Sequence, residues 1–260
     1  MKITLAIKKR DNPYIPIEAE AITTKTFLEK KPEDISVWYG NSEQKLTEIF
    51  DVRVEGDAKS EDEVTIIMSG NCSAVKRVGE YMNGGIIEIE GNIGHHCGNF
   101  MSGGLIEIRG NAESWLGREM RGGKIICHGD AQNYCGSGYR GEKKGMTGGT
   151  IEVMGSAGDF TAETLAGGEV IIRGNTGNLA GAEMIDGTLK IYGDAHLPCA
   201  NMKGGTCHVY GTAYNVLPTF EYKGLIKAGD QASQMHMFNG DIANRNAKGT
   251  LYAAKYEFFK

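Results

Sequence analysis

The sequence contains no run of about 18 apolar residues, so we expect no membrane-spanning helix. Its N-terminal stretch, MKITLAIKKRDNPYIP, has only a short apolar segment before KKRD and no small-residue cleavage site, so we expect no signal peptide. Basic residues are not in excess, because 28 Lys and Arg stand against 33 Asp and Glu, for a net charge of -5. That balance argues against a nucleic-acid partner. We expect a cytoplasmic protein.

Common enzyme and metal-site motifs are also missing. The sequence has neither a phosphate-binding P-loop nor a G-x-S-x-G nucleophile elbow. Its six cysteines include no CxxC pair, which removes the usual zinc and iron–sulfur spacings. They are Cys72, Cys97, Cys127, Cys135, Cys199 and Cys207, and we expect buried structural thiols. We therefore expect no catalytic, cofactor-binding or metal-binding residue in this chain.

Glycine is the residue in excess, at 38 of 260, and the glycines mark an internal repeat. Most apolar runs follow a Gly-Gly pair and end at another glycine, so the unit reads roughly M-x-G-G-x-I-x-I-x-G-N-A. The closing glycines are Gly70, Gly91, Gly110, Gly129, Gly155, Gly174, Gly193 and Gly211. Their numbers differ in turn by 21, 19, 19, 26, 19, 19 and 18, so a 19-residue step recurs.

Each unit predicts one strand with a single buried face, because apolar residues alternate with mostly polar ones. The first inward column is Ile66, Ile87, Ile106, Ile125, Ile151, Val170, Leu189 and Cys207. The second is Met68, Ile89, Ile108, Cys127, Val153, Ile172, Ile191 and Val209. Small polar residues after the closing glycine should hydrogen-bond along the stack. They are Asn71, Asn92, Asn111, Asp130, Ser156, Asn175, Asp194 and Thr212.

A unit of this length buries its apolar face only by stacking on copies of itself. The sequence therefore predicts an all-β fold, a right-handed parallel β-helix (solenoid) of about 7–8 coils with a 19-residue repeat. A left-handed hexapeptide helix does not fit a 19-residue step. We expect an N-terminal cap with a strand and a short helix over 1–63, the repeat over 64–211, and a C-terminal cap or docking tail over 212–260.

Two surface features leave their role open. The 26-residue step inserts seven residues within SGYRGEKKG, residues 137–145, which form either a contact surface or a solvated loop. The outward strand column is polar except at Ile67, Ile126 and Ile171, which suggests a strip where a partner docks.

The motif GHHCG, residues 94–98, resembles a set of metal ligands. Consecutive residues of an extended segment point in opposite directions, however, so these side chains should not converge on one ion. In register, His95 aligns with Ala74, Ser114, Asn133, Asp159 and Asn178, a mostly polar outer column. His96 aligns with Val75, Trp115, Tyr134, Phe160 and Leu179, which predicts a stacked apolar and aromatic column rather than a metal site.

The repeat resembles the glycine-rich β-helix domain of glutamate synthase large subunits. Together with IPIEAEAITTKTF, LTEIFDVRVEG and the run from IEGNIGHHCGNF to ICHGDA, the chain is more similar to the C subunit of formylmethanofuran dehydrogenase. That family implies a scaffold subunit of an oxidoreductase complex that reversibly fixes CO₂ onto methanofuran in methanogenic archaea. A similar subunit of a bacterial formyltransferase/hydrolase complex is the alternative, and a glutamate-synthase-like structural protein is a further one.

The resemblance implies that the cofactors of the complex, a tungsten- or molybdenum-pterin, iron–sulfur clusters and a dinuclear metal site, belong to other subunits. The expected partners are the pterin-metal redox subunits, an amidohydrolase-like subunit and ferredoxin-like iron–sulfur subunits. Two other function classes remain. A stand-alone enzyme predicts turnover or bound metal in the isolated chain, and a glycan-binding rod predicts affinity for polysaccharide.

Overall fold

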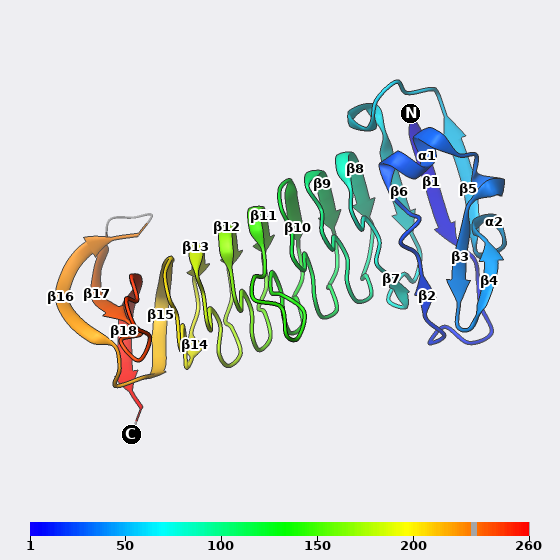
Figure 1. Cartoon of the computed structure of the whole chain (residues 1–260). Coiled ribbons are helices and arrows are strands. Elements are labelled where there is room, and N and C mark those ends of the chain that lie inside the picture. The colour runs from blue at the N-terminus through cyan, green and yellow to red at the C-terminus, as the bar shows by residue number, and fades with distance from the viewer. Residues whose placement is uncertain (230–232, 260) are drawn as a thin grey trace.

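The computed structural model describes residues 1–229 and 233–259, and the described chain is almost entirely β-structure (Figure 1). Its short helices are α1 (Thr24–Glu29), α2 (Leu46–Ile49) and the 3-10 turns η1 (Pro32–Asp34) and η2 (Glu61–Glu63). The strands are β1 (Lys2–Ile7), β2 (Ile17–Glu18), β3 (Ser36–Tyr39), β4 (Ser42–Lys45), β5 (Phe50–Glu55), β6 (Thr65–Ser69), β7 (Val75–Lys76), β8 (Asn83–Ile89), β9 (Gly103–Ile108), β10 (Lys124–Cys127), β11 (Thr147–Val153), β12 (Ala166–Ile172), β13 (Asp186–Ile191), β14 (Ala195–His196), β15 (Thr206–Val216), β16 (Glu221–Ala228), β17 (Ser233–Gly240) and β18 (Gly249–Phe258). The all-β prediction is confirmed.

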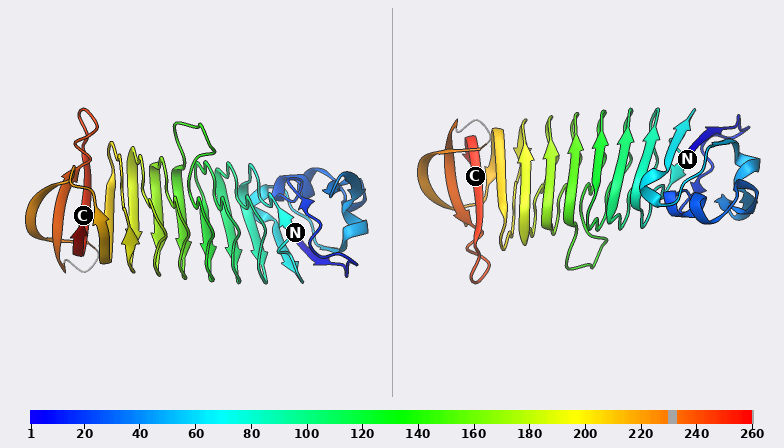
Figure 2. Two further views of the ribbon diagram at one scale, coloured as in Figure 1. Left: turned by 90° about the horizontal axis from the view of Figure 1, so that it is seen from below. Right: turned by 90° about the horizontal axis from the view of Figure 1, so that it is seen from above.

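One large sheet runs the length of the molecule in the order β16-β17-β18-β15-β13-β12-β11-β10-β9-β8-β6-β1-β5. Every neighbouring pair from β1 to β18 is parallel, and the antiparallel strands β5, β17 and β16 lie only at the ends. Figures 1 and 2 show the repeat units side by side in one row, with the two chain ends at opposite ends of the row. A second sheet, β4-β3-β2-β7, joins the N-terminal segment to the first repeat unit, which contributes β7.

The predicted inward columns are confirmed by the strand register. Ile87 pairs with Ile106, Ile106 with Ile125, and Ile125 with Ile151, and the pairing continues through Val170, Leu189 and Cys207. All of these side chains are fully buried. A second line of parallel bridges joins the mostly small residues Ile93, Ala112, Ala131, Ala157 and Thr176 on another side of the stack. Each unit is thus held to the next at two places, which fixes its register.

The Gly-Gly pairs are required by close backbone contact. A side chain on Gly103 would collide with the carbonyl oxygen of Asn83 in the unit before it. Gly104 has φ +84°, a left-handed conformation that L side chains rarely adopt. The ε-methyl of Met82 lies 2.7 Å from where a Cβ on Gly104 would stand, so the methionine of one unit fills the space under the next glycine pair.

The predicted polar column forms a continuous ladder from Asn92 onwards, whereas the Asn71 Oδ1 accepts a hydrogen bond from the Ser73 N–H of its own unit. The Asn92 Oδ1 accepts a hydrogen bond from the Asn111 N–H, and the Asn111 Oδ1 accepts one from the Asp130 N–H, each at 2.8 Å. The same pattern continues through Ser156, Asn175, Asp194 and Thr212. Because each side chain bonds to the backbone of the following unit, the ladder joins consecutive turns of the chain.

The terminal segments continue the parallel sheet. β1, predicted in ITLAIKK, lies parallel to β6, and the predicted helix near TTKTFLEK is α1, with Thr23 as its N-cap. At the other end β18 lies parallel to β15. Residues 137–145 form a loop that projects from the row (Figure 2). Among the described residues, no helix is long and apolar enough to cross a membrane.

The cysteine and isoleucine predictions differ in outcome. All six cysteines are buried and free, as predicted. The outward isoleucines Ile67, Ile126 and Ile171 are half-buried rather than exposed. Ile126 lies between Glu107 and Glu152 of the neighbouring strands, whose longer side chains share this face of the sheet.

Candidate functional site

The predicted stack of rings is present on the turn side of the repeat. The His96 and Trp115 ring centroids are 5.0 Å apart, those of Trp115 and Tyr134 are 4.9 Å apart, and those of Tyr134 and Phe160 are 5.1 Å apart. The rings are nearly parallel, with interplanar angles of 5–13°. Each of these residues has a positive φ, from 58° to 66°. The same unusual turn conformation therefore recurs in each unit and aligns the rings.

One member of this column was wrongly predicted. Arg77, not Val75, precedes His96, because Arg77 has φ 61° and donates its N–H to the His95 carbonyl, as His96 does to Ser114. Val75 instead lies in β7 and pairs with Ile17. The step from Gly70 to Gly91 is longer than the regular 19-residue step by two, and both extra residues fall between Gly70 and this turn. By the same shift, Lys76 rather than Ala74 stands beside His95.

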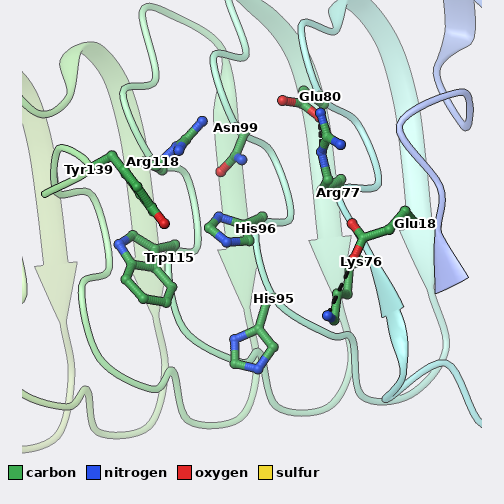
Figure 3. Close-up of a pocket in the computed structure, with 10 residues that line it drawn as sticks. All are labelled: Glu18, Lys76, Arg77, Glu80, His95, His96, Asn99, Trp115, Arg118 and Tyr139. Atoms are coloured by element: carbon green, nitrogen blue, oxygen red, sulfur yellow. Dashed lines mark hydrogen bonds and ion pairs between the residues drawn. The ribbon is translucent and has the colours of Figure 1, made fainter. Parts of the chain in front are cut away.

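A pocket of about 470 Å³ lies beside the first rings of the stack (Figure 3). Its lining side chains come from three successive units, from β2 and from the inserted loop. They are Glu18, Lys76, Arg77, Glu80, His95, His96, Asn99, Trp115, Arg118 and Tyr139. Tyr139 belongs to loop 137–145 and lies over the pocket, with its ring centroid 5.8 Å from that of Trp115 and 6.4 Å from that of His96.

The GHHCG side chains do not converge. Cys97 is 1% exposed and belongs to the core, whereas His95 and His96 are half-buried and line the pocket. Within residues 1–229 and 233–259, no group of three or more His, Cys, Asp or Glu side chains is arranged to hold a metal ion. Burial raises the pKa of the Cys97 thiol far above its usual range, and it raises that of Cys72 to about 11. These thiols stay protonated near neutral pH and are poor nucleophiles.

Each of the three cations in the pocket has a carboxylate oxygen within 4 Å, but only two of them are hydrogen-bonded to it. The Arg77 Nε lies 2.6 Å from the Glu80 Oε2, and the Lys76 Nζ lies 3.3 Å from the Glu18 Oε1. Arg118 is different, because its guanidinium carbon lies over the Phe100 and Tyr139 rings, at 4.6 and 5.1 Å from their centroids.

Burial, followed by the charges of Arg118, His95, Arg77 and Lys76, lowers the pKa of His96 to about 4. Its imidazole is therefore neutral at neutral pH. Five buried polar atoms of the lining residues have no hydrogen-bond partner in the described structure. They are the Nδ1 atoms of His95 and His96, Asn99 Oδ1, Trp115 Nε1 and Arg118 Nε. These unpartnered atoms give the site the capacity to hydrogen-bond a polar group.

Sequence reasoning placed His95 and His96 in their columns but missed the pocket and its cations. Arg118 and Tyr139 become neighbours only because the inserted loop folds back across earlier units. The available signal was the 26-residue step, which located the insertion but not its direction.

Fold and site together describe an all-β repeat protein in which a pocket lies on the turn side of the stack.

No family model matches the chain. The C subunit of tungsten-containing formylmethanofuran dehydrogenase 2 of Methanococcus maripaludis is 46% identical over 265 residues, covering 96% of each chain. The C subunit of molybdenum-containing formylmethanofuran dehydrogenase 1 of Methanosarcina barkeri is 41% identical over 85 residues, which cover 32% of this chain and only 28% of that relative.

The C subunit of the tungsten-containing enzyme 2 of Methanothermobacter marburgensis is 36% identical over 97 residues, covering 36% of each chain. Among solved structures, a chain of the formyltransferase/hydrolase complex of Methylorubrum extorquens, determined with methylofuran, aligns with a TM-score of 0.84. That alignment covers 96% of this chain and 98% of the other at 24% identity, so it establishes a shared fold. The full-length match shows that the chain belongs to the family of formylmethanofuran dehydrogenase C subunits.

Proposed function

We propose that this chain is the non-catalytic scaffold subunit of a formylmethanofuran dehydrogenase complex, which reversibly reduces CO₂ and attaches it to methanofuran as formylmethanofuran. The observation that carries this function is the 46% identity to a C subunit of that enzyme over 96% of both chains. In this proposal tungsten or molybdenum, the iron–sulfur clusters and the dinuclear metal site belong to the partner subunits, and the assembly is cytoplasmic.

A scaffold role fits an architecture in which the chain winds as a right-handed parallel β-helix. The unbroken parallel register from β1 to β18 and the second line of bridges support this winding. Residues 64–211 then form the rod, residues 1–63 cap one end, and residues 212–260 cap the other. Such a rod is stiff because every unit is bonded to both neighbours, so it can hold larger subunits at fixed separations.

The chemistry of the described side chains supports a structural role over a catalytic one. The thiols are buried in the core, and Lys76 and Arg77 are engaged by Glu18 and Glu80. A partner surface is expected on the outward strand face, where Ile126 and Ile171 interrupt a charged column. Because they are half-buried at the surface, both can make apolar contact with another subunit.

The second candidate is the same scaffold role in a formyltransferase/hydrolase complex. The TM-score of 0.84 to a chain of such a complex favours it. The two candidates differ in chemistry, because only the dehydrogenase complex reduces CO₂. A complex that transfers and hydrolyses formyl groups without electron transfer would therefore support the second candidate.

The test is purification of the native assembly through an affinity tag on this chain. We expect larger subunits to co-purify, with tungsten or molybdenum and CO₂-dependent redox turnover in the complex, and neither metal nor turnover in the isolated chain. A double variant, Ile126→Glu with Ile171→Glu, should release partners, and Glu88→Gln on the same face is its control. Recovery of this chain as an active monomer would overturn the proposal.

A further inference from the structure

The pocket beside the aromatic stack has unmet hydrogen-bonding capacity that the scaffold role does not explain. Asn99 is 1% exposed, and its Oδ1 has no partner. The Nε–H groups of Trp115 and Arg118 are buried and have no acceptor. A buried polar group without a partner costs free energy, and a buried charge costs more. These groups are therefore arranged for something that enters the pocket.

Arg118 is the cation that remains available. Its side chain is 14% exposed, and the nearest carboxylate oxygen, on the adjacent Glu119, lies 3.7 Å from its Nε, beyond hydrogen-bond distance. The Phe100 and Tyr139 rings contact the guanidinium but offer no lone pair to its N–H groups. The guanidinium thus has an ion-pair contact with Glu119 but no hydrogen-bond acceptor for its buried Nε–H.

Trp115 and the paired acidic residues of the pocket also favour a negatively charged ligand. The Trp115 Nε1–H can only donate. Glu18 and Glu80, the acidic residues of the lining, are each paired with a cation of the lining, so they repel an incoming anion weakly. Burial is the main cause of the lowered pKa of His96, and the nearby charges of Arg118, His95, Arg77 and Lys76 lower it further. A group that supplies acceptors and negative charge therefore fits the donors of Trp115 and Arg118, and Asn99 can offer its NH₂ in place of its Oδ1 when its amide is rotated by 180°.

We infer that this pocket binds a carboxylate, with Arg118 as its main charged contact, Trp115 as a second donor and Tyr139 as a cover. A carboxylate is planar and presents two acceptor oxygens to the N–H groups of a guanidinium. Its source is either a free small acid or an acidic side chain of a partner subunit. Binding of a partner's acidic side chain rests on the proposed function, whereas binding of a free acid does not.

The free-acid arm uses Trp115 as the reporter. The chain has 2 tryptophans, Trp115 in the pocket and Trp38 in β3 of the N-terminal segment. In a Trp38→Phe variant, Trp115 is therefore the only source of tryptophan fluorescence. We expect succinate to change Trp115 fluorescence saturably in the full chain. Arg118→Gln should weaken binding at least tenfold. Arg109→Gln should not, because Arg109 pairs with Glu107 on the strand face. Inorganic phosphate that binds as tightly as succinate would overturn the assignment to carboxylates.

The partner arm uses zero-length carbodiimide crosslinking of the purified complex. We expect a crosslink from Lys76, at the pocket wall, to an Asp or Glu of another subunit, and we expect Arg118→Gln to reduce it severalfold while Arg109→Gln leaves it unchanged. A crosslink without succinate binding identifies a partner side chain as the source, and the reverse result identifies a free acid. Absence of both overturns the inference.

Failure of the proposed function is distinguishable from failure of the inference. If the wild-type chain recruits no partner, the scaffold role fails, whereas the fluorescence titration still decides whether the pocket binds a carboxylate. Thermal melting of the Arg118→Gln variant beside Arg109→Gln verifies that any loss is not caused by unfolding. Tyr139→Ala provides a further measure, because removal of the cover should accelerate succinate release while leaving the stack intact.

Discussion

Two columns of the same repeat obey different rules. The inward strand column is aliphatic in unit after unit and fully buried, as at Ile87, Ile106 and Ile125. The turn column, which we define as Arg77, His96, Trp115, Tyr134, Phe160 and Leu179, keeps one backbone conformation while its side chains change from charged to aromatic to aliphatic. The inward column must fill a closed space, whereas the turn column is half-open.

This difference shows where a repeat protein can acquire function. A substitution in the inward column removes packing that both neighbouring units need. The turn column requires only a residue that tolerates positive φ, so a cation or a donor can be introduced without disturbing the stack. The carboxylate pocket lies beside the units where the turn column has its most polar members, Arg77 and His96.

The largest expected effect compares two truncations of equal size. Ile106→Ala removes a fully buried side chain between two other isoleucines and should lower the free energy of unfolding by about 2–5 kcal/mol. Leu179→Ala removes as many carbons from the half-buried turn column and should cost roughly 1 kcal/mol. Urea denaturation of both variants is the measurement. Equal losses would contradict the distinction between the columns.

The inward column could be predicted from sequence because its cause is local and periodic. A strand with one buried face must alternate, and glycines that recur with a 19-residue step set the register, so the pairing of Ile106 with Ile125 followed from counting. The turn column failed only at Val75, where two extra residues precede the turn. Counting backwards from Gly79, whose φ of +72° matches +71° at Gly98, gives Arg77 instead.

The pocket could not be predicted because its cause is not periodic. It depends on the direction in which loop 137–145 folds, which places Tyr139 above Trp115 of an earlier unit. It also depends on Arg118 making no hydrogen bond to a carboxylate, although the sequence places Glu119 beside it. Only the geometry shows that this carboxylate lies beyond hydrogen-bond distance.

A smaller effect is expected at the polar ladder, which joins the units between the two columns. Asn111→Ala removes the acceptor of the Asp130 N–H and should cost about 0.5–1 kcal/mol, because water can partly replace this exposed acceptor. Asn111→Asp keeps an oxygen in the same place and should recover most of that loss. Urea denaturation separates the two variants, and equal destabilisation would show that the ladder bond itself contributes little.

The smallest expected effect is a pH dependence of stability that comes from His96 in the turn column, because the inward column contains no histidine. Burial, and then the neighbouring cations, lowers the pKa of His96 from 6.5 to about 4. Between these values the unfolded chain takes up a proton that the folded chain refuses, so stability is lost as the pH falls from about 6.5 towards 4. His96→Phe keeps a ring in the stack and should flatten the melting temperature across this window, whereas His95→Gln controls for the loss of an imidazole. The difference between the wild-type and His96→Phe profiles is the measured contribution of His96. Profiles that stay parallel from pH 7 to pH 4 would mean that His96 protonates as readily in the folded stack as in the unfolded chain.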